Sequence, residues 1–234
     1  MALTAQVDRD CLAIRRLIAD GAIGEVIGTR IVLRIEKGPW YWSGGYTGRV
    51  RSDWRGSKAR AGGGLLIINT VHDLNMLRFV TGLEVTRLSC EYDTLATPVE
   101  VEDIVSVAYR YANGAIGAVD ACSAVRGQDP FEEIYRIYGD AGQIIRGSPP
   151  RIFVTNAVAG LTRGVWQDVP VAADGPRGDR VAVVDGFARA VLAGEPPPVR
   201  AEDGWAALAF ITAAYRSGRE HRTIELGGAS IMSE

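Results

Sequence analysis

Residues 61–82, AGGGLLIINTVHDLNMLRFVTG, contain three consecutive glycines and then an apolar run that Asn69, His72, Asp73 and Asn75 interrupt. The apolar residues fall almost all round a helix through this segment, which predicts a helix that is buried on most of its sides. Residues three or four apart share one helix face, so Asn69, His72 and Asp73 are expected to lie together. The chain has only two histidines, and one of them stands in this helix.

His72 has two interpretations at this point. In the structural one, His72 is a core histidine with satisfied hydrogen bonds, and Asp73 pairs with Arg78 or with a neighbouring backbone amide. In the functional one, His72 is a general acid or base at the mouth of a pocket, because histidine titrates near neutral pH and an adjacent carboxylate can orient it.

The segment before the glycines, residues 38–64, has no regular hydrophobic period and is predicted to be a long loop, which is a common place for functional residues. Flat aromatic faces and forked guanidinium donors suit a polyhydroxylated or anionic small molecule. A solvated surface loop or a subunit contact is the alternative. The candidate substrate-binding residues of this segment are Trp40, Trp42, Tyr46, Arg49, Arg51, Trp54 and Arg55.

The remainder of the chain predicts an α+β domain. Helical spacing predicts helices at 8–20, 180–194 and 201–217, the last with an apolar stripe that includes Trp205. Residues 25–37 alternate as a strand, with Ile27 among the apolar positions and Arg30 on the opposite face. Further strand-like runs occupy 85–92, 103–111, 115–125, 132–139, 143–147, 151–156 and 164–171. Short turns between them, including Asn113-Gly114, favour a mostly antiparallel sheet. We expect one domain over residues 1–234.

Composition disfavours several classes of protein. The net charge of −2 gives no positive field for nucleic acid. No apolar run approaches the length of a membrane span and the N-terminus does not resemble a signal peptide, so we expect a cytoplasmic protein with no membrane partner. Cys11, Cys90 and Cys122 are odd in number and widely spaced, which fits neither a disulfide framework nor a metal knuckle. We expect no bound metal.

A dinucleotide-binding fold needs a glycine-rich turn between its first strand and helix, so that the backbone can approach the pyrophosphate. The sequence contains no GxGxxG and no GxxxxGK, and the three glycines at 62–64 follow a loop rather than a strand. We therefore expect no cofactor to be bound by this chain alone.

The order of these segments resembles the C-terminal domain of a known family. GAIGEVIG, a strand, a Trp- and Arg-rich loop, SDWRGSKARAGGGLLIINTVHDLNMLRFVTG, a run of strands and finally FARAVLAGEPPPVRAEDGWAALAFITAAYRS are similar to the glucose-fructose oxidoreductase, inositol dehydrogenase and rhizopine-catabolism (Gfo/Idh/MocA) family. The resemblance covers nearly the whole chain. It implies a large open sheet with helices packed on one face, without the N-terminal Rossmann domain that binds NAD or NADP in a complete enzyme.

The resemblance also assigns roles to residues. His72 matches the catalytic histidine of the family. The position four residues earlier, often Asp in the family, is Ile68, and Asn69 resembles the Ile-Asn variant of some branches, so Asn69 or Asp73 is expected to assist His72. The family's catalytic lysine belongs to a Glu-Lys-Pro motif that precedes this domain. Lys37 lies in Glu-Lys-Gly-Pro after the first strand, and we do not predict that it is catalytic.

Three functions remain open on the sequence. The first is the substrate-binding and oligomerisation domain of an NAD(P)-dependent oxidoreductase for a sugar, polyol or related hydroxy compound, inactive in redox chemistry without a cofactor domain. The second is a stand-alone module that binds a sugar or sugar acid, and the third is cofactor-independent acid/base chemistry. In each case we expect a homodimer or homotetramer through an apolar open sheet face, and a separate Rossmann domain is a possible partner.

Overall fold

The structure is a computed structural model that describes residues 3–49, 51–127, 134–172 and 180–227. In these residues nine strands form one sheet in the order β8-β7-β6-β5-β1-β4-β3-β2-β9. The strands are β1 (Val26–Arg34), β2 (Val85–Asp93), β3 (Ile104–Tyr111), β4 (Ile116–Cys122), β5 (Ile134–Gly139), β6 (Gly142–Ile145), β7 (Arg151–Val154), β8 (Gln167–Asp168) and β9 (Ile224–Glu225).

Strand pairing is antiparallel throughout except between β1 and β4, which run parallel from Gly28↔Ile116 to Arg34↔Cys122. The β3–β4 hairpin turns at Asn113-Gly114, where Gly114 has φ +89°. The predicted α+β class with a large, mostly antiparallel sheet is therefore confirmed. Strand β9 was not predicted, and residues 132 and 133 of one predicted strand lie outside the described residues.

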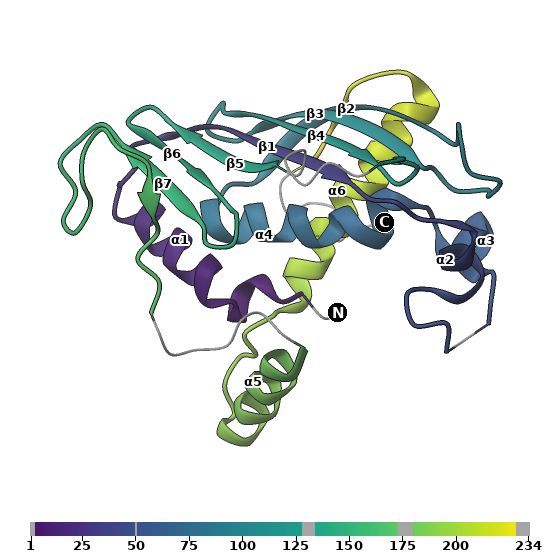
Figure 1. The fold of residues 1–234 in the computed structure, drawn as a ribbon, viewed down its shortest axis with the longest axis horizontal. Helices are drawn as coiled ribbons and strands as arrows, with labels where there is room; N and C mark the ends of the chain where they lie inside the picture. The colour runs from purple at the N-terminus through teal and green to yellow at the C-terminus, as the bar shows by residue number, and fades with distance from the viewer. Residues whose placement is uncertain (1–2, 50, 128–133, 173–179, 228–234) are drawn as a thin grey trace.

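Helices cover one face of the sheet. In Figure 1, α1 and α4 lie below the strands, α6 crosses behind them, and α5 lies apart from this layer. The 3-10 helix at Ala5–Val7 precedes α1, whose first turn is capped because the Asp8 carboxylate accepts the backbone N–H of Cys11 at 2.9 Å. The helices are α1 (Arg9–Ala19), α2 (Pro39–Gly44), α3 (Lys58–Ala61), α4 (Val71–Thr81), α5 (Arg180–Ala193) and α6 (Ala201–Glu220).

The main core lies between the sheet and these helices. Strand β1 contributes Ile31 and Leu33, and α4 contributes Leu77, all buried. Thr29 also faces this layer, where its hydroxyl lies 2.9 Å from the hydroxyls of Tyr109 and Tyr111. Ile27, which we predicted on the buried face, is 54% exposed, because the pairing register of β1 and β5 shifts between Val26 and Gly28.

The opposite face of the sheet is mixed rather than apolar as expected, because charged side chains lie there beside the exposed Ile116 of β4. Arg34 forms a 2.6 Å ion pair with Asp120 of β4, and Ser106 of β3 also contacts Asp120. Arg30 and Arg87 are exposed on the same side. Alternation leaves mainly small and polar residues here because most large apolar residues of each strand point to the helices.

The segment predicted as a long loop folds into short helices. Alpha-helix α2, the 3-10 helix Trp54–Gly56 and α3 occupy residues 39–61, which we call the aromatic lobe. Tyr41 and Trp42 form a small separate core with Val101. Proline at the first position of α2 suits a helix start and explains why helix begins there without an apolar period.

Two further findings concern the helices. Trp205, predicted in the apolar stripe of α6, is 49% exposed, and the buried face of α6 instead includes Ala207, Phe210 and Ile211. Among the described residues, no helix is both long and apolar enough to cross a membrane.

Candidate functional site

The three-glycine turn fits against two residues from distant parts of the chain. A Cβ atom on Gly64 would lie 2.2 Å from the carbonyl oxygen of Glu102, and one on Gly63 would lie 2.0 Å from the hydroxyl of Tyr215. Only glycine permits this approach, since real Cβ contacts are not so short. The glycines therefore serve close packing at the start of a helix.

Glu102 caps that helix. Its buried carboxylate accepts the N–H groups of Gly64 and Leu66 at 2.7 and 2.9 Å and the hydroxyl of Tyr215 at 2.8 Å. Burial first, and then the Glu102 carboxylate, raise the pKa of Tyr215, which stays a hydrogen-bond donor. The free N–H groups of a helix start and a carboxylate are complementary in charge.

A π-helical segment, Leu66–Thr70, lies between the glycines and α4. Single π-turns are frequent at functional sites. Within this segment the side-chain carbonyl of Asn69 accepts a hydrogen bond from the ammonium of Lys37, just beyond the end of β1. Asn69, one of the predicted site residues, is thus held by a hydrogen bond from a residue 32 positions away in the sequence.

Lys37 is only 2% exposed and is the largest of the fully buried side chains. Its ammonium nitrogen lies 4.5 Å from the ring centroid of Tyr41 and 5.5 Å from that of Trp42. Burial lowers the pKa of Lys37 to about 8, Glu102 opposes that shift and Arg55 adds to it. A cation held in this way is a frequent feature of binding and catalytic sites.

His72 is the second residue of α4. Its side chain is exposed, so it is not a core histidine. Partial desolvation and then the Arg180 guanidinium at the start of α5 lower the pKa of His72 below its ordinary value of 6.5. Neutral at pH 7, the imidazole can accept a proton.

Asp73 and Arg78 do not pair as the structural interpretation suggested. Arg78 contacts Glu84 at 2.6 Å and Asp203 at 2.8 Å. Asp73 lies near Arg146. Burial alone would lower the pKa of the Arg146 guanidinium. Cys11, Asp8 and Asp73 raise it, so that this pKa lies above its ordinary value. The predicted assistance of His72 by Asp73 therefore stays a prediction.

The aromatic lobe divides the predicted substrate-binding residues into two groups. Trp42 is buried, and Arg55 is half-buried with its guanidinium carbon 5.7 Å from the Tyr41 ring and 4.6 Å from the Trp54 ring. The other group is more exposed and consists of Trp40, Tyr46, Arg49, Arg51 and Trp54. The structure thus brings Lys37, Trp42 and Arg55 together around Tyr41.

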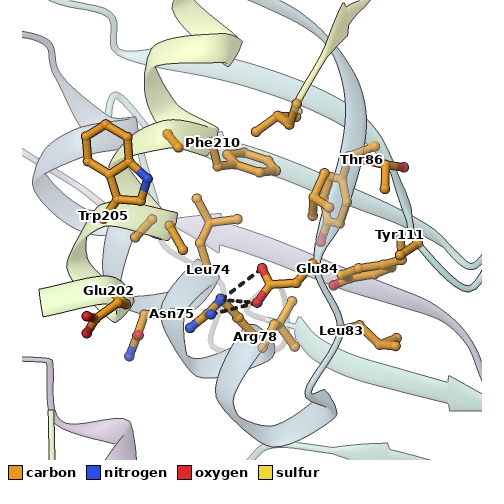
Figure 2. A pocket seen from close by; sticks show the side chains of 18 of the residues that line it. Leu74, Asn75, Arg78, Leu83, Glu84, Thr86, Tyr111, Glu202, Trp205 and Phe210 are labelled. Atoms are coloured by element: carbon orange, nitrogen blue, oxygen red, sulfur yellow. Dashed lines mark hydrogen bonds and ion pairs between the residues drawn. The ribbon is translucent and has the colours of Figure 1, made fainter. Parts of the chain in front are cut away.

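A cavity of about 480 Å³ lies at the other end of α4. Figure 2 shows Phe210 and Trp205 of α6 on its walls and the Arg78–Glu84 ion pair beside it. Its lining is mainly apolar and includes neither His72 nor Lys37. A second cavity of about 570 Å³ lies on the open sheet face between Glu91 and Arg222. Neither belongs to the candidate site.

The helix start after the glycine-rich turn is not free to bind a pyrophosphate, because the Glu102 carboxylate accepts the N–H groups of Gly64 and Leu66. The described residues contain no group of three His, Cys, Asp or Glu side chains that could hold an ion.

Sequence reasoning missed two residues of this site, Lys37 and Glu102. A signal for Lys37 was present, since the chain has only two lysines among 26 basic residues and one lies next to the aromatic lobe. No sequence signal identified Glu102, because its partners lie 36 to 113 residues away.

Comparison with known proteins gives consistent matches. Residues 11–145, more than half of the chain, match the GFO/IDH/MocA C-terminal domain. Myo-inositol 2-dehydrogenase of Thermotoga maritima is 30% identical over 188 residues, which cover 71% of this chain and 50% of that protein. The chain thus spans about half the length of this relative.

Solved structures share the fold. The aldose-aldose oxidoreductase of Caulobacter crescentus in complex with glycerol aligns with a TM-score of 0.75 at 24% identity, covering 95% of this chain and 62% of that one. A levoglucosan dehydrogenase in complex with NADH aligns with a TM-score of 0.71 at 22% identity, covering 94% and 64%.

Proposed function

The chain belongs to the GFO/IDH/MocA family through its C-terminal domain, and from this premise we propose that it is the substrate-binding and oligomerisation part of an NAD(P)-dependent oxidoreductase for a sugar, polyol or related hydroxy compound. The observation that carries the proposal is the position of His72, exposed and neutral at pH 7, three residues after Asn69, which Lys37 holds in place.

In this role His72 handles the proton of the reaction. Oxidation of an alcohol removes a hydride from carbon and a proton from oxygen, and neutral His72 accepts that proton. Asn69 turns its carbonyl to Lys37, and its amide N–H groups, which have no acceptor among the described residues, can donate to a substrate hydroxyl. The hydride acceptor is then supplied by a cofactor-binding domain. In this chain the helix start after the glycine-rich turn is capped by the Glu102 carboxylate and is not open to a pyrophosphate.

The test is a titration of the purified chain with NADH, NADPH and a panel of polyols, aldoses and sugar acids. We expect no saturable cofactor fluorescence change, and a response of the His72 resonances, assigned by their loss in His72→Gln, to at least one hydroxy compound. Saturable binding of either cofactor, or silence of His72 toward the whole panel, would contradict the proposal. His221→Gln is the control, since His221 lies at the far end of α6.

We propose that two copies associate through the open sheet face. The support is that small side chains of β3 and β4, Ala108 and Ala118, lie in register there and permit close approach of a second sheet. Ala118→Arg is expected to yield monomers in sedimentation experiments, whereas Arg163→Ala, outside the sheet, is not. A monomeric unmodified chain would contradict this point.

We also propose that the protein works in the cytoplasm. All three cysteines are free and two of them are buried, as is usual in a reducing compartment. Cell fractionation of the native host tests this location.

A further inference from the structure

Two cations of the aromatic lobe share one tyrosine ring. The Lys37 ammonium lies 4.5 Å from the centroid of Tyr41, and the Arg55 guanidinium carbon lies 5.7 Å from the same centroid. Burial disfavours the charged form of Lys37, Glu102 partly offsets this effect, and Arg55 adds to it. Like charges that are near one another and shielded from water need a counter-charge.

The nearby carboxylates are already engaged. Glu102 accepts three hydrogen bonds from the helix start and from Tyr215. Asp53 pairs with Arg60 at 2.8 Å, and Glu100 accepts the backbone N–H of Lys58 at 3.0 Å. Within the described ranges, neither Lys37 nor Arg55 has a carboxylate at ion-pair distance.

The unpaired polar atoms of this cluster are donors. Nη1 of Arg55 and Nε1 of Trp42 are both buried, and each lacks an acceptor among the described residues. Arg, Lys and Trp side chains have no acceptor atoms. A neutral hydroxyl can accept from these donors but then needs an acceptor for its own hydrogen, whereas an oxyanion only accepts. Donors without a nearby acceptor therefore favour an oxyanion.

We propose that Lys37, Arg55 and Trp42 form a binding site for an oxyanion carried by the substrate, either the carboxylate of a sugar acid or the phosphate of a sugar phosphate. This inference rests on the proposed function, which accounts for the sugar part of the ligand. It assigns a binding site to the charged group of that ligand. Lys37 connects the oxyanion site to Asn69, three residues before His72, so the charged group is anchored on one side of the reacting hydroxyl.

Lysine NMR tests the proposal directly, because Lys37 and Lys58 are the only lysines. Protein labelled with ¹³C at lysine Cε gives two signals, and Lys58→Arg assigns them. In the free protein Lys37 should titrate near pH 8. Saturating D-glucuronate or D-glucose 6-phosphate should raise that midpoint by about one pH unit, equivalent to tenfold tighter binding to the charged lysine. D-glucose should leave it unchanged, and the responding acid identifies carboxylate or phosphate.

Variants test whether the charged side chains of this site bind the acid. Lys37→Met and Arg55→Gln should each weaken binding of the responding acid about tenfold, while Lys58→Met and Arg60→Gln, exposed changes in the same lobe, should not. Arg55→Gln keeps the Lys37 signal as a readout if Lys37→Met fails to fold. An equal shift with glucose, or no shift with either acid, overturns the inference. If glucose alone perturbs His72, the proposed function stands without this site; if His72 stays silent toward the whole panel, both fall.

Discussion

The ammonium of Lys37 donates to the side-chain carbonyl of Asn69 and thereby joins the end of β1 to the π-helix that leads into α4. Both residues are shielded from solvent, Lys37 almost completely. The contact links the aromatic lobe to the segment that carries His72. Its energetic and chemical consequences can each be measured.

The stability of the protein should depend on pH through Lys37. Burial lowers the pKa of Lys37 from 10.5 to about 8, so between these values the unfolded chain binds a proton that the folded chain has lost. The free energy of unfolding therefore rises with pH in that window, by up to roughly 3 kcal/mol. Urea unfolding of the unmodified protein and of Lys37→Met across the window should show this difference; a constant difference between them would rule out a strongly shifted Lys37.

Removal of the Glu102 carboxylate should destabilise the start of the π-helical segment that leads into α4. Glu102→Ala leaves the N–H groups of Gly64 and Leu66 without their acceptor in a buried place, which should cost roughly 3 kcal/mol or more in thermal or urea unfolding. Glu102→Gln keeps one acceptor oxygen and should cost less. Glu91→Ala, an exposed change on β2, is the control and should cost well under 1 kcal/mol; equal losses at both positions would refute the capping role.

The glycine turn should not tolerate a methyl group. In Gly64→Ala the new Cβ would meet the Glu102 carbonyl oxygen at 2.2 Å, and relief by backbone movement should cost about 1–3 kcal/mol. Gly44→Ala meets nothing within 4 Å and should be close to neutral. Paired melting curves of the two variants check this, and a stable Gly64→Ala protein would mean that the turn is looser than described.

His72 should titrate below its ordinary value of 6.5 because of desolvation and the Arg180 guanidinium. The unfolded chain then binds the proton more readily, so this group's contribution to stability rises with pH up to about 6.5. NMR can follow the imidazoles, since His72 and His221 are the only histidines. Arg180→Gln should raise the pKa of His72, whereas Arg189→Gln, paired with Asp185 on the same helix, should not. An unchanged His72 pKa in Arg180→Gln would show that the Arg180 guanidinium does not lower it.

Local patterns were sufficient for the elements of the fold. The apolar run after Gly64 predicted a buried helix, and α4 has six buried residues. Alternation and Asn113-Gly114 predicted the β3–β4 hairpin, which forms as expected. Such predictions succeed because helix and strand periods are written into neighbouring residues. They fail where tertiary contacts override the period, as at Trp205 and in the aromatic lobe.

Sequence alone thus determined the α+β class and the family. Tertiary structure decided the composition of the candidate site. The sequence does not predict a role for Lys37, because its motif follows the first strand whereas the family's motif precedes the domain, yet the fold buries Lys37 against Asn69, 32 residues away. Glu102 reaches Gly64 across 38 residues and Tyr215 across 113. Contacts over such separations depend on strand order and helix packing, which no local period encodes.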